Sequence, residues 1–409
     1  MANGYTTRVL HTPLPKNDAY GSLHMPVYDG VGFEFGTASE MEEVFSGRKM
    51  GHAYARTSNP TVDYFERKLK NVTDSHAVLA MASGMAAISS AIFSLVENGG
   101  NIISSNHLFG HTYALFRNTL ASMGIEVHFA DVADTDALEA VRDEHTRAVF
   151  FETITNPQLE IVDITKLADW AHGHGIALVA DSTTTPPYVF NSKLFGVDVE
   201  VMSATKFISG GATTFGGAIV DNGLFDWRKL PALEKWGNQF GKDAFIARLR
   251  KEIFRHLGGS MTAHTAHYMN LGLDILALRV DKCVDNTRAL AESMARNPLI
   301  KAVNYPSLPS NPGFRLAQSQ FNGKPGAILT FDLESEEACF RFMDKLKVIR
   351  RATNLNDNKS LIIHPYSTIY AEFTPQERLG MGVMPSMMRL SVGIEDVADL
   401  VADIQQALS

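Results

Sequence analysis

The stretches ALVADST (177–183) and EVMSATKFISGG (200–211) determine the expected fold of this 409-residue chain. In both, a short apolar run ends in polar side chains, as at the end of a buried strand. Outward from them, five further apolar runs recur: HAVLAM at 76, NIISS at 101, EVHFA at 126, AVFFE at 148 and GAIVD at 217. Stretches of helical period separate most of these runs, which predicts a mostly parallel, seven-stranded sheet covered by helices on both faces.

The order of these runs predicts an α/β protein with more than one unit. GAIVD follows EVMSA too closely for a helical crossover, so we expect it to return antiparallel. Beyond it come a long helical region, 244–295, and a smaller α/β unit with strands near 326, 348 and 388 and a terminal helix from 395. Residues 1–60 are rich in Pro and Gly, with one expected helix at 40–45. The predicted parts are an N-terminal segment that contacts another surface (1–60), the seven-stranded domain (61–257) and a small C-terminal domain (258–409).

Composition excludes several classes of protein. Hydrophobic residues make up 45% and charged residues 20% of the chain, which is typical of a folded domain rather than a disordered one. The net charge of −8 provides no basic field for nucleic acid. No apolar run approaches the roughly 20 residues that span a bilayer, and the N-terminus lacks a signal-peptide core. Cys283 and Cys339 support neither a disulfide framework nor a metal site. We expect a cytoplasmic protein that binds no nucleic acid, membrane or metal.

Reactive side chains gather at the predicted carboxyl ends of the strands, where ligands of open α/β sheets bind. Asp181 ends the run ALVAD, and Lys206 lies just beyond EVMSA in a stretch rich in Ser, Thr and Gly. The stretch SGM (83–85) follows HAVLAM at the expected start of a helix, where backbone N–H groups and the helix dipole hold a phosphate. AVFFE leads to Asn156. One edge of the sheet is therefore expected to offer a phosphate site, an amide, a carboxylate and an amine.

This combination suits pyridoxal 5'-phosphate (PLP). The cofactor needs an amine that forms a Schiff base, a phosphate site, and an anion that keeps its pyridine nitrogen protonated. Lys206 fits the first requirement and Asp181 the last. Taken singly, Lys206 could be a solvated surface lysine and Asp181 a helix cap, and a Ser-Gly turn is common. Their occurrence together at one sheet edge favours a cofactor site.

A second class of enzyme is compatible with part of the pattern. Ser203-Ala-Thr-Lys206 matches the S-x-x-K motif of penicillin-recognising serine acyltransferases. That chemistry requires the serine at a helix start and the triplets S-D-N and K-T-G elsewhere. Neither triplet occurs in the sequence, and Ser203 lies at an expected strand. The PLP interpretation is therefore preferred.

At this point the chain resembles the Cys/Met-metabolism family of PLP enzymes, over nearly its whole length and in the right order. The motifs that carry the resemblance are YARTSNPT (54–61), ASGMAA (82–87), ETITNP (152–157), ADST (180–183), SATKFISGG (203–211) and RLSVGIED (389–396). RLSVGIED and three further stretches are most similar to the O-acetylhomoserine sulfhydrylases of that family: FDWRKLP (225–231), AFIARLRKE (244–252) and SLIIHPYST (360–368). The resemblance implies PLP fold type I, the fold of aspartate aminotransferase.

The resemblance also implies a role for each matching residue. Lys206 would be the Schiff-base lysine and Asp181 the partner of the pyridine nitrogen, while Tyr54 and Phe109 join Lys206 as expected catalytic residues. Arg389 would bind the substrate α-carboxylate, with Asn354 beside it. The remaining expected cofactor contacts are Ser83, Gly84, Met85, Phe109, Asn156, Thr183, Ser203 and Thr205, with Tyr54 and Arg56 reaching the phosphate from a neighbouring subunit.

The implied partners are an amino-acid substrate, sulfide or a thiol, and a second copy of the chain. A shared active site implies a dimer, which in this family is usually doubled to a homotetramer. The implied activity is γ-replacement on O-acetyl-L-homoserine, giving homocysteine or methionine in methionine biosynthesis. A γ-synthase, a methionine or cystathionine γ-lyase, and a silent PLP-binding protein are the alternatives.

Two departures from the family pattern bear on the substrate. The segment Leu108-Phe109-Gly110-His111 has phenylalanine where tyrosine is usual, so the stacking residue has no hydroxyl with which to protonate a leaving group. Acetate can leave without that proton more easily than a thiolate can. Phe109 therefore favours an activated ester over lyase action, although His111 or Tyr54 could supply a proton. The stretch Gly211-Ala212-Thr213 replaces the His-Gly-Asp of many relatives.

Overall fold

The computed structural model describes residues 4–15 and 20–409. Parts of the predicted N-terminal segment 1–60, and of the opening stretch in which no signal-peptide core was found, therefore lie outside the described residues. Within the described chain, no helix has the length and apolar character needed to span a membrane, and no three His, Cys, Asp or Glu side chains are grouped to hold a metal ion.

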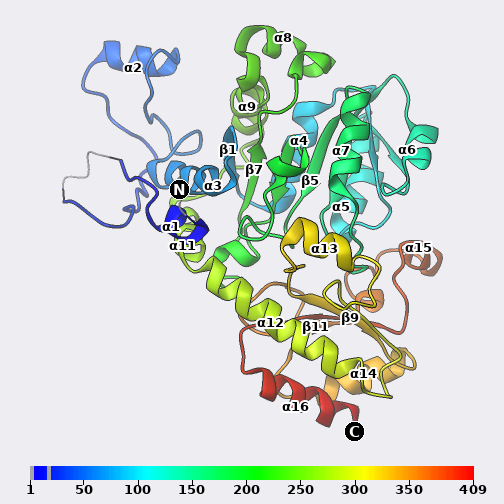
Figure 1. Cartoon of the computed structure of the whole chain (residues 1–409). Coiled ribbons are helices and arrows are strands. Elements are labelled where there is room, and N and C mark those ends of the chain that lie inside the picture. The colour runs from blue at the N-terminus through cyan, green and yellow to red at the C-terminus, as the bar shows by residue number, and fades with distance from the viewer. Residues whose placement is uncertain (1–3, 16–19) are drawn as a thin grey trace.

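The predicted seven-stranded sheet is confirmed (Figure 1), with the strand order β1-β7-β6-β5-β4-β2-β3. Only β7 runs antiparallel to its neighbours β6 and β1, as its short connection predicts. The strands are β1 (Ala77–Met81), β2 (Asn101–Ser104), β3 (Glu126–Phe129), β4 (Thr146–Glu152), β5 (Ala177–Asp181), β6 (Val199–Met202) and β7 (Gly217–Asp221).

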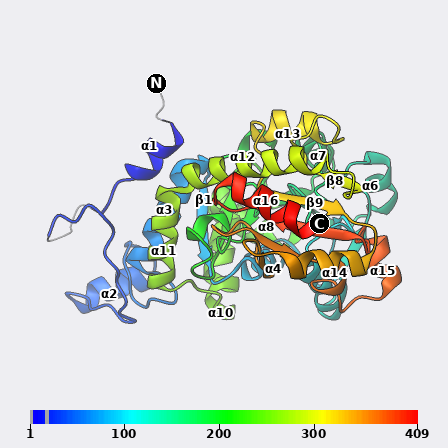
Figure 2. The same cartoon turned by 90° about the horizontal axis from the view of Figure 1, so that it is seen from below.

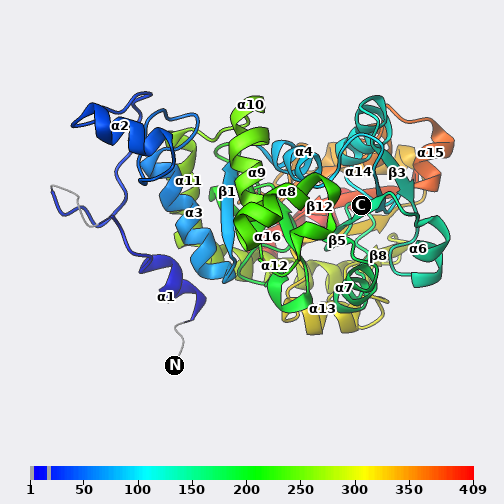
Figure 3. The same cartoon turned by 90° about the horizontal axis from the view of Figure 1, so that it is seen from above.

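Helices cover both faces of this sheet. Successive residues of a strand point to opposite faces, so both faces carry apolar side chains that pack against helices. In β1, Val78 and Ala80 pack into one buried cluster, while Leu79 and Met81 pack into another. Figure 3 shows α8, α9 and α10 gathered near the edge strand β1. The helices are α3 (Pro60–Thr73), α4 (Gly84–Leu95), α5 (Gly110–Ala114), α6 (Thr135–Val141), α7 (Ile164–Gly173), α8 (Pro231–Phe240), α9 (Ala244–Arg248) and α10 (Arg255–Leu257), with π-helical segments Leu115–Leu120 and Leu249–Phe254 and 3₁₀ turns at Ser192–Phe195, Phe207–Ser209, Trp227–Lys229 and Gly241–Asp243.

A five-stranded, mostly antiparallel sheet forms the predicted second α/β unit, with the order β10-β11-β12-β9-β8. Figure 2 shows α14 and α16 covering this sheet, and their apolar residues share a buried cluster with β9 and β12. The elements are β8 (Ala302–Asn304), α13 (Phe314–Phe321), β9 (Ile328–Asp332), α14 (Glu336–Lys345), β10 (Arg350–Arg351), β11 (Leu361–Ile363), a 3₁₀ turn (Pro365–Ser367), α15 (Pro375–Gly380), β12 (Met387–Ser391) and α16 (Val397–Leu408).

Two long helices connect the sheets. α11 (Ala263–Asp274) and α12 (Leu276–Met294) follow the predicted interruption at 258–259. Buried residues of α11 and of the first half of α12, from Ala266 to Val284, pack with the core of the seven-stranded sheet. The core of the second sheet begins at Leu290. The division of the chain at residue 258 stays a prediction.

The N-terminal segment contains one more helix than the sequence predicts. The expected helix is present as α2 (Ala38–Phe45), but Tyr5–Leu10 forms a further helix, α1, so the prediction of a single helix is wrong. Contacts with later parts of the chain stabilise α1. Val9 is fully buried, and Arg8 donates two hydrogen bonds to Asp74 at 3.1 and 2.7 Å. α2 projects away from the body of the molecule in Figures 1, 2 and 3.

Candidate active site

A cavity of about 650 Å³ lies at the carboxyl ends of the parallel strands, and segments of the second sheet close its other side. This is the place at which open α/β sheets bind ligands. The cavity brings together nearly all of the predicted site residues, from positions far apart in the chain. The predicted residues that line it are Ser83, Gly84, Met85, Phe109, Asn156, Asp181, Thr183, Ser203, Thr205, Lys206, Asn354 and Arg389.

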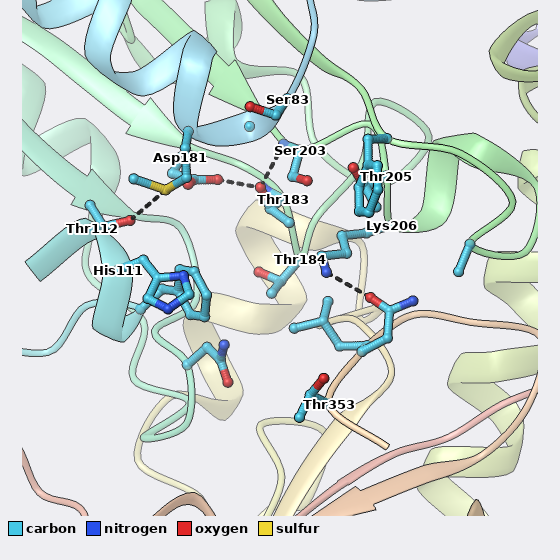
Figure 4. Close-up of a pocket in the computed structure, with 18 of the residues that line it drawn as sticks. Ser83, His111, Thr112, Asp181, Thr183, Thr184, Ser203, Thr205, Lys206 and Thr353 are labelled. Atoms are coloured by element: carbon cyan, nitrogen blue, oxygen red, sulfur yellow. Dashed lines mark hydrogen bonds between the residues drawn. The ribbon is translucent and has the colours of Figure 1, made fainter. Parts of the chain in front are cut away.

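The start of α4 forms an anion cradle at one end of the cavity. Ser83 caps the helix, because its side chain accepts a hydrogen bond from Ala86 N–H at 3.1 Å. The first N–H groups of a helix have no partner within it and attract a phosphate. A Cβ on Gly84 would lie only 2.7 Å from the Ser203 Cβ, so the close approach of these two segments requires glycine. Figure 4 shows Ser83, Ser203 and Thr205 on the same side of the site, which suits a phosphate.

Asp181 is a partly buried carboxylate at the end of β5. Its Oδ1 accepts a hydrogen bond from the Thr183 N–H at 2.9 Å, and Thr183 Oγ1 in turn accepts from the Ser203 N–H at 2.8 Å (Figure 4). Burial raises the pKa of Asp181, since a charged carboxylate loses hydration there. A protonated ring nitrogen placed against it would stabilise the ionised form. The position therefore fits the acidic partner that PLP requires.

Lys206 points into the cavity from the turn that follows β6. Its Nζ donates a hydrogen bond to Asn354 Oδ1 at 2.6 Å, drawn in Figure 4. Burial, and next the positive charge of Arg389, lower the pKa of Lys206 to about 8. A lowered pKa leaves more of the amine neutral near physiological pH, and only a neutral amine attacks an aldehyde.

Uptake of PLP by the cofactor-free protein should therefore accelerate with rising pH and level off above about 8, where the Lys206 amine has lost its proton. An amine with its ordinary pKa of 10.5 would still gain reactivity in proportion to pH well above that point. Stopped-flow absorbance of the bound cofactor across neutral and alkaline pH measures this. A rate that keeps rising tenfold per pH unit beyond about 9 would contradict the lowered pKa.

Arg389 is a buried guanidinium without an acidic partner. It lies in β12, is 2% exposed, and donates from Nη1 to Asn156 Oδ1 at 3.0 Å and from Nη2 to the Asn354 carbonyl at 3.3 Å. No ion pair joins it to a carboxylate within the described chain, and its Nε is buried without a partner. Burial lowers the pKa of Arg389 to about 10. A buried charge is costly unless it is paired, so this side chain is suited to an anion that enters the cavity.

Tyr54 and Arg56 lie outside this cavity. Arg56 Nη1 donates to the Arg255 carbonyl at 2.6 Å, and its guanidinium lies 5.5 Å from the centre of the Tyr54 ring. Tyr54 is 45% exposed in the single chain. Their expected contact with the phosphate of a neighbouring subunit stays a prediction.

Sequence reasoning missed several side chains of the cavity. Glu152 ends β4, next to Asp181 in the sheet, and it is buried. The strand-end argument that identified Asp181 applies equally to Glu152 and could have identified it. Thr353 and Leu355 line the cavity from the irregular segment between β10 and β11, and no pattern in the sequence distinguishes them.

Comparison with known proteins gives a match along the whole chain. A family model described as "Cys/Met metabolism PLP-dependent enzyme" matches residues 6–409. L-Methionine gamma-lyase of Pseudomonas putida is 35% identical over 99% of this chain and 97% of its own length. O-Acetyl-L-homoserine sulfhydrylase 1 of Thermus thermophilus is 36% identical over 99% of this chain and 100% of its own.

Solved structures are similar over the same range. A Campylobacter jejuni protein, assigned provisionally as an O-acetylhomoserine (thiol)-lyase, matches with a TM-score of 0.96 and 33% identity over 99% of this chain and 100% of its own; its crystal structure holds a lysine-linked pyridoxyl phosphate. An O-acetylhomoserine sulfhydrylase of Wolinella succinogenes is 49% identical, with a TM-score of 0.79 over 87% of this chain and 99% of its own. The family match includes every residue that lines the cavity.

Proposed function

Because this chain belongs to the Cys/Met metabolism family of PLP-dependent enzymes, we propose that it replaces the γ-acyloxy group of an O-acylhomoserine with sulfide or a thiol. The preferred acyl substrate is O-acetyl-L-homoserine. The Cγ–O bond breaks and a Cγ–S bond forms, so that acetate leaves with the electron pair and the attacking sulfur gives up its proton. Sulfide then yields homocysteine, and methanethiol yields methionine.

The observation that carries this proposal is the position of Arg389 in the same cavity as Lys206. A buried guanidinium that lacks a carboxylate partner suits the α-carboxylate of an amino acid, which its planar fork can hold through two parallel hydrogen bonds. A substrate held in this way would have its α-amino group and Cα in the cavity that Lys206 also lines. An amino acid is therefore the substrate class that the site fits best.

Lys206 has the position and the basicity to move protons on such a substrate. When bound, PLP supplies an aldehyde carbon to which the substrate amine becomes attached and a ring that accepts electrons from Cα. Lys206 Nζ would remove the proton from Cα and then one from Cβ, which requires an amine that is neutral when free. The pKa of about 8 that burial gives Lys206 is consistent with that requirement. Asn354, whose Oδ1 accepts from Nζ, would orient the amine.

Phe109 supports an ester substrate over a thioether. It lines the cavity and cannot donate a proton, and acetate is a much weaker base than a thiolate. The relatives include O-acetylhomoserine sulfhydrylases and a homocysteine synthase, but also a methionine gamma-lyase, so the leaving group must be settled by experiment.

The variant Phe109→Tyr should gain γ-lyase activity on methionine or cystathionine by about tenfold or more, because the new hydroxyl can protonate the departing sulfur. Its γ-replacement activity on O-acetylhomoserine should change less than this. Release of 2-oxobutyrate measures the first reaction and release of acetate the second. A wild-type enzyme that already cleaves methionine faster than it uses the ester would contradict the proposed role of Phe109.

Product analysis tests the proposed function directly. The holoenzyme is mixed with O-acetylhomoserine, O-succinylhomoserine, cystathionine or methionine, each with and without sulfide, and acetate, succinate, thiol and 2-oxobutyrate are measured. We expect sulfide-dependent homocysteine and an equal amount of acetate from the acetyl ester. Fast 2-oxobutyrate release from methionine without sulfide would identify a γ-lyase instead.

The proposed assembly is a dimer with shared active sites, doubled to a homotetramer. The N-terminal segment supports it, because Tyr54 and Arg56 are exposed and neither lines the cavity of its own chain. Several apolar side chains of this segment, among them Leu23 and Met50 at 90% and 95% exposed, have little cover in the single chain. Sedimentation of the wild type beside a variant lacking the Tyr54 ring would test whether this segment contributes to the assembly.

A further inference from the structure

Glu152 is a buried acidic residue for which the proposed reaction has no role. It is 7% exposed, it is the last residue of β4, and it lines the cavity. Its hydrogen bonds connect two loops that carry residues of the proposed site. This arrangement differs from that of a surface carboxylate, whose partners are mostly water.

Each oxygen of the Glu152 carboxylate accepts a backbone N–H from a different loop. Oε1 accepts from Phe109 N–H at 2.6 Å, at the start of α5. Oε2 accepts from Asn156 N–H at 3.2 Å, in the loop after β4. The first loop therefore holds the ring that is expected to stack on the cofactor. The second holds the amide whose Oδ1 accepts from Arg389 Nη1.

A residue of the segment between β11 and β12 contacts the same two loops. The Tyr370 hydroxyl lies 2.9 Å from the Leu108 carbonyl and 3.0 Å from the Asn156 carbonyl. The two loops thus lie between a carboxylate that binds their N–H groups and a hydroxyl near their carbonyls. Because this polar network is buried, removing one partner leaves the others unsatisfied.

Glu152 also lies beside Asp181, its register partner in β5. Burial, and next the charge of Asp181, raise the pKa of Glu152 well above its ordinary value. Placing two carboxyl groups so close together in the interior is unfavourable, and an apolar side chain would avoid the cost. The two accepted hydrogen bonds offset part of this cost, because they stabilise the carboxyl group where it lies.

We propose that Glu152 is a positioning residue, which fixes Phe109 against the cofactor ring and Asn156 against Arg389 through its two backbone hydrogen bonds. The inference rests on the proposed function, because it assigns the stacking ring and the carboxylate-binding arginine to one reaction. The proposed role of Glu152 predicts that loss of one of these hydrogen bonds changes the position and orientation of the bound cofactor without unfolding the protein.

The variant Glu152→Gln tests this with the smallest change in shape. Glutamine keeps one acceptor oxygen and puts an NH₂ group, which only donates, against one of the two N–H groups. The matched control is Glu200→Gln: Glu200 is also buried, at 0% exposed, lies in β6 and accepts from Ser182 and Ser192, but it does not line the cavity.

For Glu152→Gln we expect kcat/KM for γ-replacement to fall at least about tenfold, with an altered visible circular dichroism of bound PLP and weaker PLP binding. The thermal unfolding temperature should stay close to that of Glu200→Gln, whose kcat/KM and cofactor dichroism should remain within about twofold of wild type. If the glutamine variant does not fold, Glu152→Asp, which keeps both acceptors on a shorter side chain, should show the same changes to a smaller degree.

A Glu152→Gln enzyme with wild-type kcat/KM and wild-type cofactor dichroism would overturn the inference. Equal losses in Glu152→Gln and Glu200→Gln would also overturn it, since they would indicate a general effect of a buried acid. A wild type without γ-replacement activity would refute the proposed function alone. In that case the cofactor dichroism and PLP affinity of the two variants would still test the role of Glu152.

Discussion

Replacing Lys206 by alanine should abolish turnover, with kcat for γ-replacement at least about 10³-fold below that of wild type. The physical reason is that, in the proposed reaction, one amine both anchors the cofactor and moves protons at two substrate carbons. No second lysine lines the described cavity. Acetate release in the presence of sulfide measures the loss, with the cofactor resupplied in excess.

Lys193→Ala is the matched control for this variant, because its Nζ donates only to the Asp74 carbonyl on the surface. It should keep wild-type turnover. A Lys206→Ala enzyme that retains more than a tenth of wild-type kcat would show that another group carries out the proton transfers.

Replacing Arg389 by lysine should lower kcat/KM for O-acetylhomoserine by about 10²–10³-fold. The substitution keeps the positive charge but loses the planar fork, so that one of the two parallel hydrogen bonds proposed for the substrate carboxylate is lost. Lysine ends in a single ammonium group and has no counterpart of Arg389 Nη1. Asn156 Oδ1 therefore loses the donor that it now has at 3.0 Å. Steady-state kinetics with saturating sulfide measures the effect.

A substrate analogue separates binding of the carboxylate from a general disturbance of the site. For an O-acetyl amino alcohol that lacks the α-carboxylate, Arg389→Lys and wild type should differ by less than about tenfold. Arg288→Lys serves as the control, since Arg288 donates to the Gly323 carbonyl away from the cavity. Equal losses on both substrates would contradict a direct contact between Arg389 and the carboxylate.

Much of the fold and the centre of the site could be predicted because both follow from local patterns. Apolar runs separated by helical stretches predict the seven strands, and the short connection to GAIVD predicts the antiparallel β7. Asp181 and Lys206 could be identified because strand ends meet at one edge of a parallel sheet, irrespective of the side chains that pack around them.

Contacts between distant parts of the chain account for what the sequence did not predict. α1 forms only six residues of helix, and its Val9 is buried by elements that come much later, so that no local periodicity indicates it. Arg389 meets Asn156 across 233 positions of sequence, and Tyr370 meets the same residue across 214. Glu152 is different, because it ends its strand directly beside Asp181 and a local pattern is enough to indicate it.

Covalent trapping of the cofactor tests the central assignment most directly. The holoenzyme is reduced with borohydride and digested, and the peptides are analysed by mass spectrometry for a pyridoxyl phosphate group. The Lys206 amine lies in the same cavity as the α4 anion cradle and Asp181, which predicts that the label lies on the peptide that contains SATKFISGG. A label on any other lysine, or a protein that stays colourless and unlabelled after incubation with PLP, would contradict it.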